Sequence, residues 1–297
     1  MLKKIDKKTL HKIVTGYSFL APNIIGFLIF TLIPVIVCFI FAFCKWDMSS
    51  PMKFVGLRNF IELFQDGDFW YFLYNTVFFM LAIPLGMAIS LIMALLLNQK
   101  LKAMVIFRTV YFLPVVSSLI AAAMVWRWIF NSDYGLLNYF LLKIGFTNVP
   151  DWLNSTFWAK PAIIIMSVWQ GAGYNMLLYL AALQGIPDSL YEAASIDGAG
   201  AWEKFWYVTW PMLSFVNFFI VTMSIITGFQ AFGVQYIMTQ GGPLNSTMTI
   251  VYYIYRNAFE WFKMGYASAI AWFLFVLMFG LTYFNFRMRK NEGYSLL

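Results

Sequence analysis

Long apolar stretches separated by short polar segments dominate this chain of 297 residues. No charged residue occurs between Lys12 and Lys45, for example, although charges flank this stretch on both sides. The hydrocarbon core of a bilayer is about 30 Å thick, so about 20 helical residues cross it. The pattern therefore predicts an all-α integral membrane protein with six transmembrane helices, at about residues 17–43, 71–97, 107–129, 162–183, 207–234 and 264–286.

Three longer polar segments join these spans on one side of the predicted membrane, at residues 46–70, 131–160 and 235–261. The stretch 205–255 carries no charge, but Gly241-Gly242-Pro243-Leu244-Asn245 interrupts it and separates the last two spans. In the first segment, apolar and polar residues from Phe54 to Phe64 alternate with a helical period. This pattern predicts an amphipathic helix at the membrane interface.

The positive charges predict the orientation, because Lys and Arg are enriched in the cytoplasmic segments of membrane proteins. Most of the Lys and Arg residues fall on one predicted side: Lys3, Lys4, Lys7, Lys8, Lys12, Lys100, Lys102, Arg108, Lys204, Arg287, Arg289 and Lys290. The tails 1–16 and 287–297 and the loop 185–206 are therefore expected in the cytoplasm, around a transmembrane domain at 17–286.

Composition supports a lipid bilayer as the surroundings of this chain. Hydrophobic residues make up 62% and charged residues 11%, whereas about a quarter of the residues of soluble domains are charged. The net charge of +7 has to be interpreted through the topology, because Lys and Arg are retained on the cytoplasmic side, and no nucleic-acid partner is expected. The single histidine, His11, and the two cysteines, Cys38 and Cys44, form neither a metal-site pattern nor a disulfide framework.

The predicted spans lack the groups that several classes of membrane protein require. Their interiors contain no Asp, Glu, Lys or His, whereas ion-coupled transporters generally carry ionisable groups near the midplane. An intramembrane hydrolase would need an acid–base pair that these spans do not supply. No phosphate-binding Gly-x-x-x-x-Gly-Lys-Ser/Thr loop occurs either. Energy for transport must therefore come from a partner chain, or not at all.

Neutral polar and aromatic side chains occupy the span interiors instead: Asn75, Thr76, Ser90, Ser117, Ser118, Ser167, Trp169, Gln170, Tyr174, Asn175, Ser224, Thr227 and Gln230. Such groups suit a neutral polyhydroxylated solute, which needs hydrogen bonds and a ring to stack on. The same residue types also join helices within membranes. For Gln170, Tyr174, Thr227 and Gln230, on two neighbouring spans, both roles stay open.

The predicted cytoplasmic loop reads as two short helices joined by a glycine turn. Pro187-Asp188 is a helix start, and Ser189 with Glu192 forms a capping-box pattern. Asp197-Gly198-Ala199-Gly200 then ends the first helix, because glycine adopts the backbone angles of a sharp reversal. We expect the second helix to begin near Ala201.

This loop resembles the cytoplasmic loop of the permeases of bacterial ATP-binding-cassette importers. The matching residues are Glu192, Ala193, Ala194, Asp197, Gly198, Ala199, Val208 and Pro211, with Trp210 where leucine is usual. In that family the helix fits a cleft of the ATPase and couples ATP hydrolysis to transport. The resemblance implies a type I importer permease fold with both termini cytoplasmic, and ATPase-coupling roles for Glu192, Ala193, Ala194, Asp197, Gly198, Ala199 and Pro211.

Over nearly its whole length the chain is similar to the first permease of carbohydrate importers, as in the maltose, multiple-sugar and glycerol-3-phosphate systems. The supporting segments are Phe54 to Phe60, Asn75-Thr76, Ala94 to Asn98, Phe107-Arg108, Tyr111 to Pro114, and Thr239-Gln240-Gly241-Gly242-Pro243. The resemblance implies a heterodimer with a second permease in the bacterial cell membrane, an ATPase homodimer or heterodimer that holds ATP and Mg²⁺, and an extracellular or periplasmic sugar-binding protein. No cofactor is expected on this chain itself, which is not expected to be an enzyme.

The resemblance also implies positions for the sugar. Counted from Glu192 and Pro211, the sugar-holding positions of the maltose permease fall on Ser167, Gly171, Tyr174, Ser224, Thr227, Gly228 and Ala231. Gly228 and Ala231 replace longer polar groups, which argues against maltose itself. The predicted substrate pathway comprises Ser167, Gln170, Gly171, Tyr174, Ser224, Thr227, Gly228 and Gln230, for a sugar of di- or oligosaccharide size.

Two alternatives from other classes stay open on the sequence. The chain would also suit a structural or assembly subunit of a membrane complex, or a self-sufficient sugar facilitator. Neither alternative requires the Glu192-Ala193-Ala194 helix, so this helix is the feature that distinguishes the importer from both.

Overall fold

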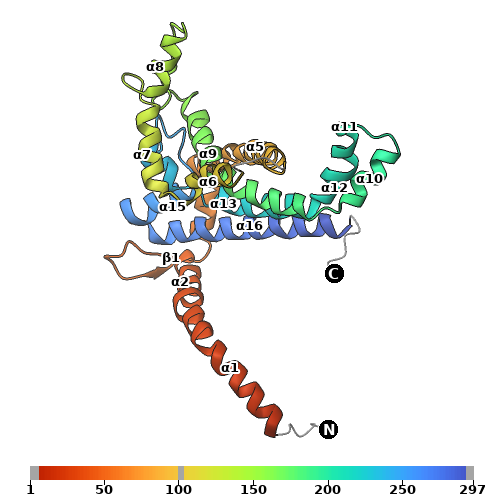
Figure 1. Cartoon of the computed structure of the whole chain (residues 1–297). Helices are drawn as coiled ribbons and strands as arrows, with labels where there is room; N and C mark the ends of the chain where they lie inside the picture. The colour runs from red at the N-terminus through yellow and green to blue at the C-terminus, as the bar shows by residue number, and fades with distance from the viewer. Residues whose placement is uncertain (1–6, 100–103, 292–297) are drawn as a thin grey trace. The chain divides into compact units, whose positions relative to one another are not determined.

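The computed structural model describes residues 7–99 and 104–291. Nearly all of its regular structure is helical (Figure 1). The predicted positive positions Lys3, Lys4, Lys100 and Lys102 lie outside the described residues. The α-helices are α1 (Lys7–Phe27), α2 (Ile33–Ala42), α3 (Arg58–Gln65), α4 (Gly67–Phe79), α5 (Ala82–Leu97), α6 (Met104–Val116), α7 (Leu119–Ile129), α8 (Leu136–Lys143), α9 (Ala159–Gln184), α10 (Asp188–Ile196), α11 (Ala201–Lys204), α12 (Trp210–Met212), α13 (Ser214–Phe229), α14 (Gly233–Met238), α15 (Ile250–Tyr255) and α16 (Met264–Asn291).

The chain divides into two compact units, and each is described by itself. The first holds the described part of Met1–Gln65 together with Ile254–Phe273. In it, α1, a π-helical segment (Leu28–Leu32) and α2 follow one another without a break. Strands β1 (Cys44–Lys45) and β2 (Lys53–Phe54) then form an antiparallel pair. The buried Asn59 amide of α3 donates to the carbonyls of Ala42 and Cys44, both at 2.9 Å, so α3 is fixed to the end of α2.

The interfacial helix predicted for Phe54 to Phe64 is shorter in the structure. Phe54 belongs to β2, Gly56 has a φ of +60°, and α3 begins only at Arg58. Phe54 cannot join a helix because its backbone pairs with Cys44 across the strands. The apolar period alone did not reveal this pairing.

The turn between β1 and β2 is suited to water rather than lipid. Asp47 Oδ1 accepts hydrogen bonds from the Ser50 hydroxyl at 2.6 Å and from the Ser50 backbone N–H at 2.7 Å. These bonds, with weaker ones from Ser49, lower the pKa of the exposed Asp47 carboxyl to about 2. A carboxylate that stays charged at every physiological pH keeps this turn outside the hydrocarbon core.

The second unit holds Asp66–Tyr253 and the described part of Leu274–Leu297, and α9 is its centre. This 26-residue helix packs against α5, where the Ser90 hydroxyl donates to the Ala172 carbonyl at 2.9 Å. It also packs against α6 at Gly173, where an added Cβ would meet the Tyr111 carbonyl oxygen. Glycine at this position therefore sets how closely α6 and α9 approach each other.

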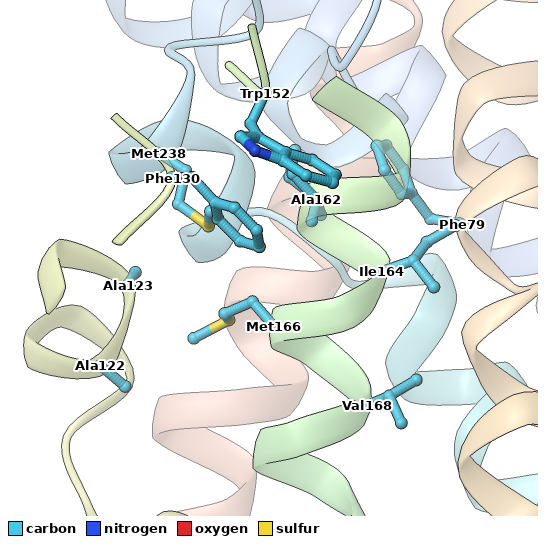
Figure 2. Packing of buried hydrophobic residues seen from close by; sticks show 11 residues of the cluster. Phe79, Ala122, Ala123, Phe130, Trp152, Ala162, Ile164, Met166, Val168 and Met238 are labelled. Carbon is cyan, nitrogen blue, oxygen red and sulfur yellow. The ribbon is translucent and has the colours of Figure 1, made fainter. Parts of the chain in front are cut away.

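A cluster of buried side chains surrounds the first half of α9 (Figure 2). Phe130 and Trp152 pack with their ring centroids 5.5 Å apart, and Met238 of α14 joins the same cluster. The Trp152 indole N–H donates to Asn138 Oδ1 at 2.8 Å, so its one polar group is satisfied. The cluster fixes the short helix α14 against α7 and α9.

Among the described residues, four helical stretches are long and apolar enough to cross a membrane. They are His11–Ala42, Gly67–Leu97, Ala159–Gln184 and Met264–Met288, and they overlap the spans expected at 17–43, 71–97, 162–183 and 264–286. Two bent pairs of helices also qualify if each pair counts as one span, which gives up to six.

The spans expected at 107–129 and 207–234 differ from the structure. The first is α6 and α7, bent by 97° after Val116, where Ser118 has an extended ψ of 127°. The second is bent by 62° at Leu213, and its helix ends at Phe229 rather than at residue 234. Phe232 is non-helical (φ −146°), and Gly233 starts the separate helix α14. Likewise, much of the connection expected at 235–261 is helical.

Candidate functional site

A cavity of about 240 Å³ lies among α4, α5, α9, α13 and α14 of the second unit, and we call it the central cavity. Its lining residues are Phe79, Met80, Ala82, Ile83, Gly86, Ser167, Val168, Gly171, Ala172, Asn175, Ser224, Thr227, Gly228, Ala231 and Gln235. None of these residues is charged. Gly171 is twelve residues from the first residue of α9 and thirteen from the last. The cavity therefore lies halfway along a helix about 39 Å long, which is near the midplane of a bilayer that α9 crosses.

Two of the hydroxyl groups in the central cavity donate their protons to helix carbonyls. Ser167 Oγ donates to the Ile163 carbonyl at 2.8 Å, and Thr227 Oγ1 donates to the Met223 carbonyl at 3.0 Å. Both oxygens can still accept hydrogen bonds. The cavity is therefore neutral, and it offers acceptors together with the donors of Asn175 and Ser224.

The structure brings together five of the eight predicted pathway residues. Ser167, Gly171, Ser224, Thr227 and Gly228 all line the central cavity. The other three, Gln170, Tyr174 and Gln230, are not among its lining residues. Tyr174 is 49% exposed, and Gln230 is an exposed residue at the C-terminal end of α13.

Sequence reasoning missed Gln235 as a lining residue. The sequence predicts this residue in the external segment 235–261, because no charge or turn marks the end of α13. In the structure Gln235 is only 3% exposed, and it belongs to α14. The break at residues 230–232 turns the chain back, so that this glutamine reaches the cavity wall.

The predicted coupling loop has the expected helix–turn–helix form. At the end of α10, the Gly198 N–H donates to the Ser195 carbonyl at 3.1 Å and the Ala199 N–H donates to the Ala194 carbonyl at 2.9 Å. These two bonds and the φ of +80° at Gly198 form a Schellman motif. Helix α11 begins at Ala201, as expected.

The capping box predicted at Ser189 and Glu192 is absent. Helix α10 begins one residue earlier, at Asp188, with Pro187 in an extended conformation as the N-cap, and no side chain bonds to this end. Pro187 fixes the backbone angle at the start of the helix, and the negative charge of Asp188 in the first turn interacts favourably with the helix dipole. Ser189 therefore lies inside the helix.

The surface of α10 is open. Glu192 and Ala193 are exposed, Ala194 is half-buried, and Ile196 is 87% exposed. Within the part of the chain that the structure describes, the Glu192 side chain makes no ion pair and no hydrogen bond. The Tyr191 hydroxyl lies 2.9 Å from Thr209 Oγ1 and ties α10 to the helix that follows. This arrangement holds α10 firmly while leaving its acidic and small residues available to a partner.

The coupling loop lies at the far end of α9 from α8 (Figure 1). Helix α8 and residues 151–158 precede the first residue of α9, and α10 follows the last. A helix that crosses a membrane places its two ends on opposite sides, so α8 and α10 face different compartments.

A second cavity, of about 320 Å³, lies at the α8 end of the second unit. Arg127, Asn131, Asp151 and Asn154 line it together with Thr239, Gln240, Gly242 and Pro243. The Arg127 guanidinium donates to the Ile237 carbonyl at 3.4 Å and links α7 to α14. The segment from Thr239 to Pro243, which the resemblance also used, therefore forms a wall of this second cavity.

Asn75 and Thr76 of α4 hold the segment that follows this wall. The Asn75 amide donates to the carbonyls of Asn245 and Met248, at 3.2 and 3.1 Å. Thr76 Oγ1 accepts from the Ile250 N–H at 2.9 Å. All three bonds are long-range, so this dipeptide fastens residues 245–250 to α4.

Replacing Thr76 with valine is expected to loosen residues 245–250 while leaving α4 intact. Valine has nearly the same shape but leaves the buried Ile250 N–H without an acceptor, which costs about 1–3 kcal/mol. Hydrogen exchange of the purified chain in detergent would show faster exchange of residues 248–253. Thr156→Val, at an exposed threonine, is the control. Equal protection in both variants would contradict the role of Thr76.

No metal site is evident in the part of the chain that the structure describes, because no three His, Cys, Asp or Glu residues cluster there. Two of the predicted coupling residues are charged, Glu192 and Asp197, and both are exposed. The candidate functional features of the second unit are therefore the central cavity and the coupling loop.

Comparison with known proteins gives consistent matches. Residues 82–290 match the model of the family described as "Binding-protein-dependent transport system inner membrane component". The lactose transport system permease protein LacF of Rhizobium radiobacter is 39% identical, over 94% of this chain and 95% of that protein. The arabinooligosaccharides transport system permease protein AraP of Bacillus subtilis (strain 168) is 35% identical, over 93% and 90%.

A solved structure matches as well. It is a chain of a bacterial alginate ABC transporter in complex with an alginate pentasaccharide-bound periplasmic protein. The TM-score is 0.85 at 25% identity, with 98% of this chain and 99% of that chain covered.

Proposed function

This chain belongs to the family of binding-protein-dependent transport system inner membrane components, and we propose that it forms one half of the membrane pathway of an ATP-driven sugar importer. Two features together carry the proposal: the neutral central cavity halfway along α9, and the exposed α10 at one end of the same helix. The names of LacF and AraP support a sugar as the substrate.

In the proposed mechanism, α10 takes force from an ATPase on the cytoplasmic side. The exposed Glu192 offers a carboxylate for hydrogen bonds or an ion pair, and Ala193 and Ala194 permit close approach. The Schellman turn at Gly198 and the Tyr191–Thr209 contact hold α10 against the following helix. Movement of α10 is therefore transmitted to α13, which carries Ser224, Thr227 and Gly228 to the cavity.

The remaining parts of the proposal concern topology and partners. We place six spans across a bacterial cell membrane, with the tails 1–16 and 287–297 and the coupling loop 185–206 in the cytoplasm. A second permease chain completes the pathway, and an ATPase pair holds ATP and Mg²⁺. An extracellular or periplasmic binding protein delivers the sugar, and the alginate transporter complex supports such a partner. Neither a structural subunit nor a sugar facilitator would need the exposed α10.

The first test is purification of the tagged chain in mild detergent together with its native partners. An ATPase is expected to co-purify with the wild type and to be lost with Glu192→Ala. Glu192 has no partner within the described chain, so its removal leaves the fold unchanged. Truncation of a central interface residue costs about 2 kcal/mol or more, which weakens binding about 30-fold.

Asp133→Ala is the matched control, because Asp133 is an exposed acid between α7 and α8, on the other side of the predicted membrane. This variant should retain the ATPase in full. If no ATPase accompanies the wild type under conditions that preserve the complex, the importer proposal is wrong.

A further inference from the structure

Gln235 stands apart from the other polar residues of the central cavity. Its side chain is 3% exposed, and its Oε1 atom is buried without a hydrogen-bond donor. Buried amide oxygens nearly always have a partner, and one without a partner calls for a ligand or a water. The residue lines the central cavity together with Ser167 and Thr227, so a ligand in that space lies next to this residue.

The position of Gln235 is fixed by its own backbone. Its carbonyl accepts from the Thr239 N–H at 3.3 Å and from the Thr239 hydroxyl at 3.0 Å. Met238, three residues later, is buried in the cluster of Figure 2. These contacts hold the backbone of Gln235 in place before any ligand arrives, which favours a specific hydrogen bond from its buried side chain.

The polar lining of the central cavity includes both hydrogen-bond acceptors and donors, the donors being those of Ser224, Asn175 and the Gln235 amide. Ser167 Oγ and Thr227 Oγ1 have donated their protons to helix carbonyls, and the Gln235 oxygen is free to accept. A sugar hydroxyl can both donate and accept, so it suits all of these groups. None of the lining residues carries a positive charge to compensate for the burial of a carboxylate or phosphate.

We propose that Gln235 contacts the transported sugar directly, accepting a hydrogen bond from a hydroxyl group of a neutral sugar unit. The cavity, at about 240 Å³, lies below the range of about 300–1,000 Å³ typical of pockets for drug-sized ligands. It therefore takes one ring of an oligosaccharide at a time. The inference rests on the proposed function and adds to it a residue and a substrate class, neutral rather than acidic.

The test uses the whole importer, reconstituted with its ATPase and binding protein in proteoliposomes. Uptake of lactose, arabinotriose and an alginate trisaccharide is measured for the wild type, alginate being an acidic polysaccharide. The neutral probe that the wild type carries fastest is then used for the variants. Gln235→Leu removes the acceptor, Gln235→Asn keeps a neutral amide acceptor on a side chain one methylene shorter, and Gln65→Leu is the control at an exposed glutamine.

Gln235→Leu is expected to reduce uptake of the neutral sugar about tenfold, the usual worth of one hydrogen bond. Gln235→Asn should stay within about threefold of the wild type, and all three variants should retain ATPase activity stimulated by the binding protein. Equal losses in Gln235→Asn and Gln235→Leu, or wild-type uptake in Gln235→Leu, would overturn the role of Gln235. A wild type that carries only the alginate probe would overturn the neutral class. A wild-type complex without ATPase activity stimulated by the binding protein would reject the proposed function itself.

Discussion

Replacing Gly198 with leucine is expected to abolish sugar uptake while leaving the chain inserted in the membrane. Gly198 has a φ of +80°, a conformation that costs a residue with a side chain about 1–2 kcal/mol. An added Cβ would meet no atom within 4 Å, so this backbone strain is the main intramolecular cost. Such a cost does not unfold a membrane protein, but relief of it shifts the end of α10 and the direction of α11.

The consequence is a coupling loop that no longer fits its proposed ATPase cleft. Uptake in proteoliposomes and ATPase activity measured on the same samples would show both activities lost together. Gly200→Ser is the control two residues later, because Gly200 has a negative φ, precedes α11 as its N-cap and faces only the flexible Glu203 side chain. Serine is favoured at such an N-cap, so this variant should transport normally. Unchanged uptake in Gly198→Leu would remove the coupling role from this loop.

The coupling loop was predictable because its signals are local. Proline at the helix start and glycine at the helix end act through the backbone angles of single residues. The structure accordingly has α10 from Asp188, a positive φ at Gly198 and α11 from Ala201. The capping box failed because Pro187 already defines the helix start one residue earlier.

The bends in the membrane helices were not predictable from hydrophobicity. The stretches around Ser117 and Leu213 are mostly apolar, although Ser118 and Ser214 follow these residues directly. A window of hydropathy therefore reads each bent pair as one straight span. The bends depend on how α7 packs against α14 and how α13 packs against α4, which are contacts between distant parts of the chain.

The same limit explains the outcome for the pathway residues near the end of α13, whereas Gln170 and Tyr174 lie on the regular helix α9 but do not line the cavity. Ser167, Gly171, Ser224, Thr227 and Gly228 lie on helices that continue regularly, so counting from the loop motif placed them in one cavity. Gln230 and Gln235 lie beyond the end of α13, where helical counting no longer applies. The break exposes Gln230 and brings Gln235 to the cavity.

Two glycines on α9 have opposite structural roles although they are two residues apart. Gly173 lies against the backbone of α6, where an added Cβ would meet the Tyr111 carbonyl oxygen. Gly171 faces the central cavity, and an added Cβ there would meet no atom within 4 Å. A change at Gly173 therefore tests packing, whereas a change at Gly171 tests the pathway.

Replacing Gly171 with phenylalanine is accordingly expected to block sugar uptake without preventing assembly. The ring would occupy the central cavity, because the open space beside Gly171 is the cavity itself. Helix α9 should tolerate the change, since glycine is about 1 kcal/mol less favourable than alanine inside a helix and phenylalanine lies between them. Uptake should fall to background, while ATPase co-purification and stimulation of ATP hydrolysis by the binding protein should persist.

Gly280→Phe provides the matched control, because Gly280 is an exposed glycine of α16 with no atom within 4 Å of its Cβ position. Both variants add the same ring to a long apolar helix, so a general effect of phenylalanine on insertion would appear in both. Gly171→Phe alone should lose uptake while it retains ATP hydrolysis. Gly198→Leu, in the coupling loop, should lose both activities, so the two results together would separate the pathway from the coupling loop. Normal uptake by Gly171→Phe would mean that the sugar crosses elsewhere, and the central cavity would then be a packing space between helices.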